Sequence, residues 1–557
     1  MISQIDFILV IPELFMLTMV NIFLLYALFF ERLGQSNQSI AIVKESETVS
    51  KHLSFFKQQH NIRTGYLSTP LLVVEPLNWL IVISLIFSVF LYINIPTNGI
   101  ILTNSFICDT YATLFKVLLC ISSAAVQALS NTSTLKIRKA RIHNYEFLLI
   151  IYLSIIGMLC LISSYNFLTF YLSIELQSLS FYLLACSKSR SEFSAEAGLK
   201  YFILGAFSSA ILLFGISLIY GSTGSIYFED VEALLEFIAP YQKNNVFQVY
   251  DFFLSGSDSY PYIGLIVGLV CITISLLFKL AAVPFHMWAP DVYEGSPMNI
   301  TAFFAITAKI AALAVLARFV MITGQLLIPI LLLVSIASLV LGTLSAMRQV
   351  KIKRFIAFSG ISNVGWFLMG ICCGRLDAVI LHLIVYIVLS ITLFSIIIQP
   401  IHTNIDSSGI VLNSPQKSVM VKYMPIKLIS DLGNIFKTNT TVALSLTLTF
   451  FSLGGIPTLA GFYSKYLIIN AAIQAEALVL LTVGLISAIL SAFYYIRVVQ
   501  TIYFSSLVVP TGGLKENWFS FEIGTMNAYL IAFTSFFTTF FIVYPECLSI
   551  WLIDITL

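Results

Sequence analysis

Four lysines and one glutamate lie inside long apolar stretches of this 557-residue sequence. They are Glu175, Lys200, Lys279, Lys309 and Lys465. An ionised side chain in the bilayer core costs several kcal/mol, from ~3 to above 10 depending on its surroundings. Lysine and glutamate can both take up and release a proton. A row of such groups therefore predicts a path for protons through a membrane protein.

The composition indicates an integral membrane protein. Hydrophobic residues make up 59% of the chain and charged residues only 10%, whereas a soluble domain carries roughly 25% charged residues. The net charge of +2 gives no indication of a nucleic-acid partner. The eight cysteines show no C-x-x-C spacing, so we predict neither a disulfide framework nor a metal site. The sequence has no GxGxxG, P-loop or haem-attachment motif, so we expect nucleotides and redox cofactors on other subunits.

Fourteen apolar segments have about the 20 residues needed to cross a ~30 Å hydrocarbon core. A spanning segment must satisfy its own backbone hydrogen bonds, so each segment should be a helix and the fold an all-α integral membrane fold. The predicted spans are 5–30, 71–95, 105–130, 144–163, 165–186, 197–221, 262–285, 299–320, 325–346, 355–373, 376–399, 440–470, 476–503 and 523–545.

The loops between these spans carry a one-sided charge. Loops 31–70, 131–143, 347–354 and 400–439, all on one side, contain five, four, four and four Lys and Arg residues. Loop 222–261, on the other side, has one Lys and six acidic residues. Basic loops face the positive-inside compartment. An even number of spans then places both termini on the opposite side.

Two predicted spans contain helix breakers close to a lysine. Span 7 includes Pro284, five residues after Lys279, and span 12 includes Gly454 and Pro457, upstream of Lys465. Proline removes a backbone hydrogen bond and clashes with the preceding turn. Broken helices in corresponding parts of two halves indicate an ion site between inverted repeats. The match is approximate, because Lys279 precedes its proline whereas Lys465 follows its own.

This pattern predicts two inverted five-helix repeats, helices 4–8 and 9–13. The predicted domains are 1–130 with helices 1–3, 144–320 with the first repeat, 325–503 with the second repeat, and 523–557 with helix 14 and the C-terminus.

Five sequence runs, in order along the chain, resemble the antiporter-like membrane subunits of NADH:ubiquinone oxidoreductase (complex I), and among them chain 2, subunit N in bacteria. The runs are IPELFML, FLTFYLSIELQSLSFYLLA, AEAGLKYFILGAFSSAILLFGISLIYG, FKLAAVPFHMWAPDVYEGSP and FFSLGGIPTLAGFYSK. The resemblance implies a subunit of a proton-translocating NADH:ubiquinone reductase without a redox centre of its own. It also implies that NAD, FMN, iron–sulfur clusters and ubiquinone bind to other subunits. Its partners would be the other membrane-arm subunits, including the neighbouring antiporter-like subunit, and lipids.

The same resemblance assigns the five charged residues to family positions. Glu175 matches the glutamate of the IELQS-type motif, and Lys200 the lysine of GLKYF. Lys279 matches the lysine of FKL-x-x-VPFH, Lys309 that of the following AxKI helix, and Lys465 that of GFYSK. The chain departs from the family pattern mainly in its long loops at 31–70, 222–261 and 400–439.

The chemistry of the charges can also be argued without the family. Lys279 has no acid within a helical turn, so a charged pair with Glu175 would keep it protonated. Lys309 and Lys465 would continue the row toward the other end of the subunit. For Lys200, near a helix end, a snorkelling role competes with a role in proton transfer.

Other charged or titratable residues within the predicted spans are weaker candidates. His382 titrates in a useful range and would lie between Lys309 and Lys465, although a packing histidine is the commoner outcome. For the remaining charges we predict pairing between helices: Glu13, Glu75, Asp109, Lys116 and Arg318.

Three functions fit these observations. The preferred one is a proton-pumping complex I subunit. The alternatives are a subunit of a cation/proton antiporter and the plastid homologue linked to plastoquinone. The N-terminus lacks signal-peptide and transit-peptide patterns, which favours an organelle-encoded protein of the mitochondrial inner membrane with both termini toward the intermembrane space.

Overall fold

A computed structural model describes most of the chain, and parts of the basic loops 31–70, 131–143 and 400–439 and of loop 222–261 lie outside the described residues. The described residues are 4–48, 69–96, 99–136, 145–188, 191–242, 260–399, 401–406, 419–424, 426–433, 435–504, 519–520, 523–546, 548–550 and 552.

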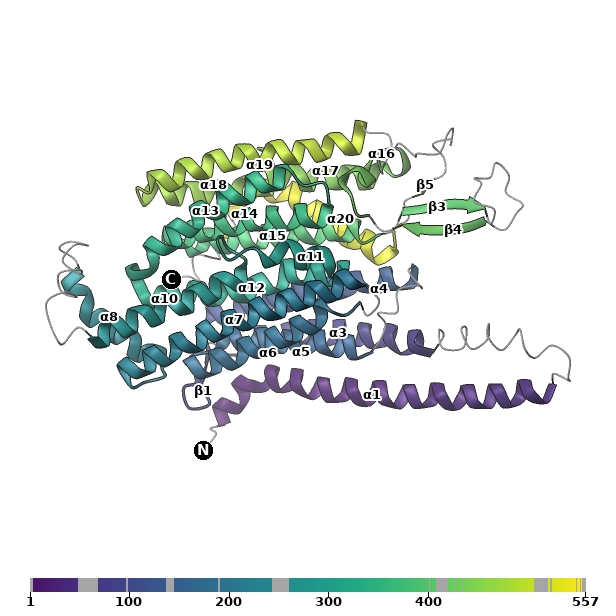
Figure 1. Cartoon of the computed structure of the whole chain (residues 1–557), viewed down its shortest axis with the longest axis horizontal. Helices are drawn as coiled ribbons and strands as arrows, with labels where there is room; N and C mark the ends of the chain where they lie inside the picture. The colour runs from purple at the N-terminus through teal and green to yellow at the C-terminus, as the bar shows by residue number, and fades with distance from the viewer. Residues whose placement is uncertain are drawn as a thin grey trace.

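The fold is a bundle of long apolar helices that run side by side (Figure 1). Among the described residues, thirteen helices are long and apolar enough to cross a membrane. They are α1 (Gln4–Thr48), α3 (Thr69–Asn94), α4 (Thr110–Lys136), α5 (Tyr145–Ser163), α6 (Phe167–Ala185), α7 (Glu192–Thr223), α10 (Tyr260–Leu280), α12 (Met298–Thr323), α13 (Ile328–Met347), α14 (Ile352–Cys372), α15 (Leu376–Ile397), α19 (Leu478–Phe504) and α20 (Thr525–Phe540). The predicted twelfth span is divided into two shorter helices, α17 (Thr440–Gly454) and α18 (Ala460–Gln474). The predicted all-α membrane fold is confirmed.

Both predicted helix breaks occur. Helix α10 ends at Leu280, four residues before Pro284, and a short helix, α11 (Trp288–Gly295), follows the break. A proline ring clashes with the carbonyl four residues earlier, which here belongs to Leu280, the last residue of α10. Helix α17 ends at Gly454 and is capped by Gly455, whose left-handed φ of 79° suits glycine because no Cβ is present.

Three segments predicted as loops contain regular structure. Helix α1 continues to Thr48, well past the predicted end of the span at residue 30. Loop 222–261 contains α8 (Phe228–Gln242), whose first turn carries two acidic residues, as the helix dipole favours. Loop 400–439 contains strands and short helices, which are β3 (Ile401–Asp406), β4 (Val419–Met424), η3 (Ile429–Leu432) and α16 (Ile435–Thr438).

Two small antiparallel sheets complete the structure. One is a hairpin of β1 (Gly99–Ile101) and β2 (Phe106–Cys108). In the other, β3 lies between β4 and β5 (Phe519–Ser520), with Ile401 opposite Met424. Short 3-10 turns, η2 (Gly324–Leu327) and η5 (Phe541–Val543), follow α12 and α20.

Helices α12, α14 and α15 form the centre of the bundle. Their apolar windows are 100%, 94% and 89% buried, whereas that of α1 is only 22% buried. Helices α5 and α6 pack together, as do α13 and α14, and the contacts of α7 with α10 correspond to those of α15 with α17 and α18. Helices at corresponding positions of the two predicted repeats are therefore in contact with each other in both repeats. Their inverted relation remains a prediction.

Two of the predicted interhelical charge pairs are confirmed. Lys116 Nζ on α4 lies 2.6 Å from Glu13 Oε1 on α1, and the Tyr92 hydroxyl of α3 donates to the same oxygen at 3.2 Å. Arg318 on α12 binds Asp109 at 2.7 Å. Glu75 is half-buried near the start of α3. The first pair holds the peripheral helix α1 against the bundle.

Removing Glu13 alone should destabilise the protein. Glu13→Gln leaves the Lys116 ammonium, only 1% exposed, without its anion, and breaking a buried pair costs ~3–5 kcal/mol. Glu13→Gln combined with Lys116→Met removes both charges and should regain most of that loss. Thermal unfolding of the assembled protein measures both. A double variant with a lower unfolding temperature than Glu13→Gln alone would contradict this account.

The two ends of the bundle carry the loops that the sequence assigned to opposite sides. Helix α8 and the start of α1 lie at one end, and β3 and β4 project from the other (Figure 1). We therefore predict that a cysteine placed at residue 412 or 350 reacts with an impermeant reagent from the positive-inside compartment. A cysteine at residue 245 should react only from the opposite side. Labelling of all three from one side would overturn the predicted topology.

Candidate functional site

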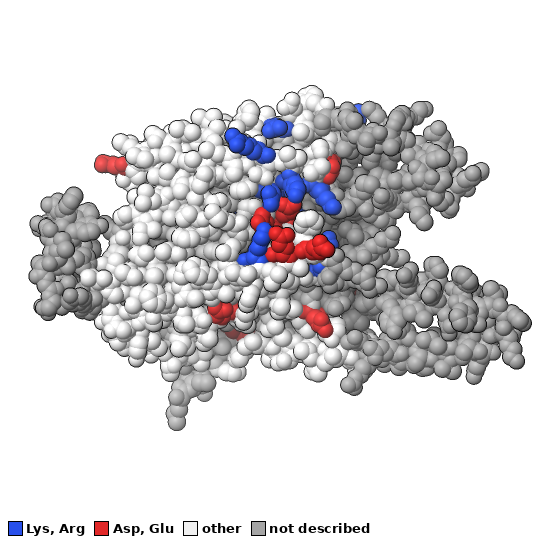
Figure 2. All heavy atoms as spheres, in the orientation of Figure 1, with Lys and Arg blue, Asp and Glu red and all other residues white. Residues whose placement is uncertain are grey.

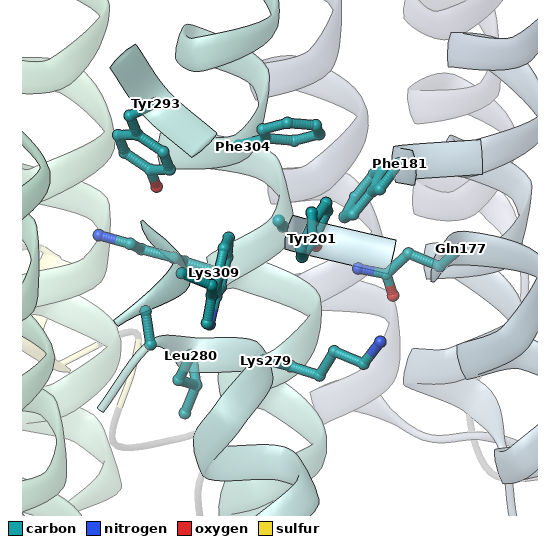
Figure 3. Close-up of a pocket in the computed structure, with 11 residues that line it drawn as sticks. Gln177, Phe181, Tyr201, Lys279, Leu280, Tyr293, Phe304 and Lys309 are labelled. Carbon is teal, nitrogen blue, oxygen red and sulfur yellow. The ribbon is translucent and has the colours of Figure 1, made fainter. Parts of the chain in front are cut away.

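A small cavity lies between α6, α7, α10, α11 and α12 at the centre of the first repeat. Its volume of about 10 Å³ is at the lower limit for one water molecule. Its polar lining residues are Gln177, Tyr201, Lys279, Tyr293 and Lys309. Figure 3 shows the Lys279 side chain extending toward Gln177 and the Lys309 side chain extending the other way. The two lysines thus meet at the cavity but point their ammonium groups in opposite directions.

Lys279 is the penultimate residue of α10, just before the break that follows this helix. Its Nζ is buried and has no hydrogen-bond partner, and it lies 5.9 Å from the centre of the Tyr182 ring. Glu175 on α6 accepts a hydrogen bond from Ser178 at 3.2 Å and acts on Lys279 only through space. Among the described residues, Glu175 and Lys279 therefore make no direct contact, and the functional role of the predicted charged pair remains a prediction. Sequence spacing could not reveal that Tyr182 stands next to the lysine.

Lys309 lies in the middle of α12, 5% exposed. Its Nζ donates to the Tyr386 hydroxyl of α15 at 3.0 Å and to the Gly360 carbonyl of α14 at 3.3 Å. A Cβ at Gly360 would lie 2.7 Å from that Nζ, so a larger residue there would displace the ammonium group from this position. Both partners are neutral, and Lys309 has no carboxylate in contact.

Lys465 lies on α18, beyond the second helix break. Its Nζ donates at 2.7 Å to the carbonyl of Leu453, in the last turn of α17. Carbonyls at a helix C-terminus lack an intrahelical partner and carry the negative end of the helix dipole. The Lys465 Nζ also lies 5.6 Å from the centre of the Trp366 ring. The break predicted from Gly454 and Pro457 therefore supplies the acceptor for the lysine.

His382 lies on α15, in the second repeat, and contacts the residue next to Lys465. Its Nδ1 is 2.9 Å from the hydroxyl of Ser464, the residue before Lys465, and its Nε2 is buried without a partner. Tyr386, which binds Lys309, lies one turn further along the same helix. Hydrogen bonds thus join Lys309 to Tyr386 and His382 to Ser464, and these residues with Lys465 lie on three helices, α12, α15 and α18.

Lys200 does not belong to this buried row. Its side chain is 44% exposed and pairs with Glu196 at 2.7 Å and with Asp291 of α11 at 3.1 Å. Asp291 also binds Arg354 at the start of α14. Figure 2 shows these charged side chains gathered in one patch on this face of the molecule. The expected place of Lys200 inside the membrane was wrong, since its long side chain reaches a polar surface cluster.

Glu294 of α11 also belongs to this surface cluster. Partial burial by itself raises the pKa of its carboxyl group, but Lys351 and Arg354 outweigh that effect and keep the pKa below its ordinary value. Glu294 is therefore ionised at neutral pH. It connects α11, which follows the break after Lys279, to the first turn of α14.

Several polar residues next to Glu175 and the buried lysines were not predicted as site residues from the sequence. They are Gln177, Ser178, Tyr182, Tyr386 and Ser464. Their positions carried a usable signal, because Ser178 and Tyr182 follow Glu175 at helical spacing and Tyr386 follows His382 by one turn. Among the described residues, no group of three His, Cys, Asp or Glu side chains could hold a metal ion.

A bundle of this kind, with two broken helices and a row of buried lysines, defines an antiporter-like membrane subunit. The family profile described as NADH:quinone oxidoreductase/Mrp antiporter, TM, matches residues 164–491. The chain therefore belongs to this family. The matched region includes every residue from Glu175 to Lys465 that is named above and excludes α1, α3 and α4.

Curated relatives narrow the family further. NADH-ubiquinone oxidoreductase chain 2 of Marchantia polymorpha is 38% identical over 80% of this chain and 82% of the relative. NADH-quinone oxidoreductase subunit N 1 of Rhizobium meliloti (strain 1021) is 36% identical over 72% and 76%. The chain thus belongs to the chain 2/subunit N family.

Solved structures share the fold. A chain of respiratory complex I from Thermus thermophilus superimposes with a TM-score of 0.64 at 24% identity, over 86% of this chain and 93% of that one. A chain of the Mrp complex from Dietzia sp. DQ12-45-1b gives a TM-score of 0.65 at 16% identity, over 88% and 92%.

Proposed function

We propose that this chain is a proton-translocating membrane subunit of a respiratory NADH:ubiquinone oxidoreductase. One observation carries the proposal. The ammonium groups of Lys279, Lys309 and Lys465 are buried, and within the described part of the chain none is in contact with a carboxylate. Their neighbours are aromatic rings, a hydroxyl and backbone carbonyls. Membership of the chain 2/subunit N family supports the same function.

The contrast with Lys116 explains why these lysines suit proton transfer. Lys116 touches Glu13 at 2.6 Å, and neutralising the lysine would leave that buried carboxylate unpaired. Lys279, Lys309 and Lys465 have only neutral contacts, so each can lose its proton without leaving a buried anion behind. Burial disfavours the charged amine. A change in a nearby charge can therefore decide whether each lysine holds its proton.

The arrangement supports a transfer route with two halves. In the first repeat, Lys279 and Lys309 border one cavity with room for about one water. Lys309 also contacts Tyr386 of the second repeat, where His382, one turn before that tyrosine, contacts Ser464, the residue next to Lys465. Glu175 lies at the Lys279 end and acts through space. The charge of Glu175 therefore decides whether Lys279 holds its proton.

The remaining assignments follow from this function. NAD, FMN, iron–sulfur clusters and ubiquinone bind to other subunits, and this chain contacts other membrane-arm subunits, including a neighbouring antiporter-like subunit, and lipids. The relatives from plants favour the mitochondrial inner membrane, with both termini toward the intermembrane space. An independent cation/proton antiporter is the second candidate, because the family profile also covers Mrp antiporters.

Purification through a tag on this chain separates the two candidates. We expect flavin and iron–sulfur subunits to co-purify, and we expect vesicles containing the complex to acidify when NADH and a quinone are added. A chain that co-purifies only with other antiporter subunits and exchanges cations for protons without NADH would contradict the proposal.

A further inference from the structure

Tyr182 occupies a position that the transfer route does not yet use. It lies on α6, on the same face as Glu175 and Ser178, and its ring centre is 5.9 Å from Lys279 Nζ. Among the described residues, the Tyr182 hydroxyl is buried without a hydrogen bond of good geometry, and the polar group next to it is the Ser178 hydroxyl. The aromatic ring, rather than the hydroxyl, is therefore the part of this side chain that meets the lysine.

The ring faces a cation that has no other short polar contact. Lys279 Nζ is buried without an acceptor, and an ammonium group within about 6 Å of a ring centre is attracted to the ring, most strongly when water is excluded. Lys309 and Lys465 also lie near rings, but each donates hydrogen bonds as well. Lys279 depends on its ring more than the other two lysines do.

Helix α7 holds the Tyr182 ring in this place. Tyr201 and Phe202 of α7 contact it edge-on, at 5.0 and 5.6 Å between ring centres. A Cβ at Gly205, also on α7, would lie 2.1 Å from the Tyr182 hydroxyl oxygen and 2.6 Å from the adjoining ring carbon. Only a glycine allows α7 and the tyrosine to approach so closely. The local sequence therefore maintains this ring position.

We propose that Tyr182 is a positioning residue for Lys279, and that Gly205 is the residue that admits its ring. The ring holds the ammonium group between Glu175 on one side and the cavity toward Lys309 on the other. Because a ring attracts the cation without binding its hydrogens in fixed directions, Lys279 stays free to turn toward either neighbour. This inference rests on the proposed proton-transfer role of Lys279.

Substitutions at Tyr182 distinguish the contribution of its ring from that of its hydroxyl group. In the assembled complex, Tyr182→Phe keeps the ring and should retain near-normal NADH:quinone turnover and proton pumping. Tyr182→Leu removes the ring and should lower both on the order of 10-fold, as expected for loss of a desolvated cation–ring contact. Tyr182→Met provides the same comparison if the leucine variant does not assemble. Equal losses with phenylalanine and leucine, or no loss with leucine, would overturn the proposal.

Two matched controls test for general packing damage. Tyr152 on α5 is equally a buried tyrosine, fully covered, with its hydroxyl near Ser84. Tyr152→Leu should affect stability but leave turnover per assembled complex unchanged. Gly221→Ala on α7 adds a Cβ with nothing within 4 Å and should be neutral.

Gly205→Ala tests the coupling between the glycine and the ring. Alone, it should lower turnover because the added methyl displaces Tyr182. In the Tyr182→Leu background it should cause no further loss, since two residues that act through one contact are not additive. Additive losses would overturn the role of Gly205. Lys279→Met separates this inference from the proposed function. If turnover is impaired in Lys279→Met but normal in Tyr182→Leu, only the role of Tyr182 is rejected. If turnover is normal in both variants, the proposed function is rejected as well.

Discussion

Replacement of Glu175 by glutamine is expected to lower proton pumping and NADH:quinone turnover together, by about 10-fold or more, the scale seen when a positioned proton-transfer group is lost. Glutamine keeps the shape and can still accept the Ser178 hydrogen bond, so only the charge that Lys279 senses is removed. A blocked pump stalls a tightly coupled enzyme, which is why turnover should fall as well. The complex should still assemble.

Glu146 offers a matched control for this variant. It is an exposed acid in the first turn of α5, the helix before that of Glu175. Glu146→Gln should leave turnover and pumping unchanged. Normal turnover in an assembled Glu175→Gln complex would remove Glu175 from the mechanism. A loss of pumping with full turnover would show instead that the two processes can be uncoupled at this site.

For Glu175, part of the prediction from the sequence agrees with the structure and part does not. Its place in the middle of α6 followed from hydropathy and from the family motif, and the search for an acid to pair with Lys279 identified it. Glu175 acts on Lys279 only through space, because spacing along a chain says which face of a helix a residue lies on but not how far it stands from a residue of another helix. The neighbour found at Lys279 is the Tyr182 ring, and Gly205 on a third helix leaves room for that ring.

Helix positions were predictable because each span must be apolar and must satisfy its own backbone. The same reasoning located the break at Pro284, where the chemistry of proline is local. Reasoning from hydropathy did not predict where the Lys200 ammonium group lies. A lysine three-quarters of a turn inside an apolar stretch can extend along the helix to an acid such as Asp291, and only the folded chain shows that α11 brings Asp291 there.

Lys465 should prove to be a transfer site rather than a fixed cation. Lys465→Met keeps the length of the side chain, so the packing around this 5% exposed residue should change little. It removes the ammonium group that donates to the Leu453 carbonyl. We expect turnover and pumping to fall by about 10-fold or more, as for loss of other groups that carry a proton. NADH-driven acidification of vesicles and NADH oxidation, both per assembled complex, provide the measurement.

Lys465→Arg distinguishes the two roles, because arginine remains protonated at every accessible pH. An arginine can donate to the Leu453 carbonyl and repel a proton on His382, but it cannot release its own proton. If Lys465 passes protons, the arginine variant should recover at most part of the activity that the methionine variant loses. Full pumping with arginine would reduce Lys465 to a fixed positive charge, and the proton would then have to leave through His382 and Ser464, which lie beside it.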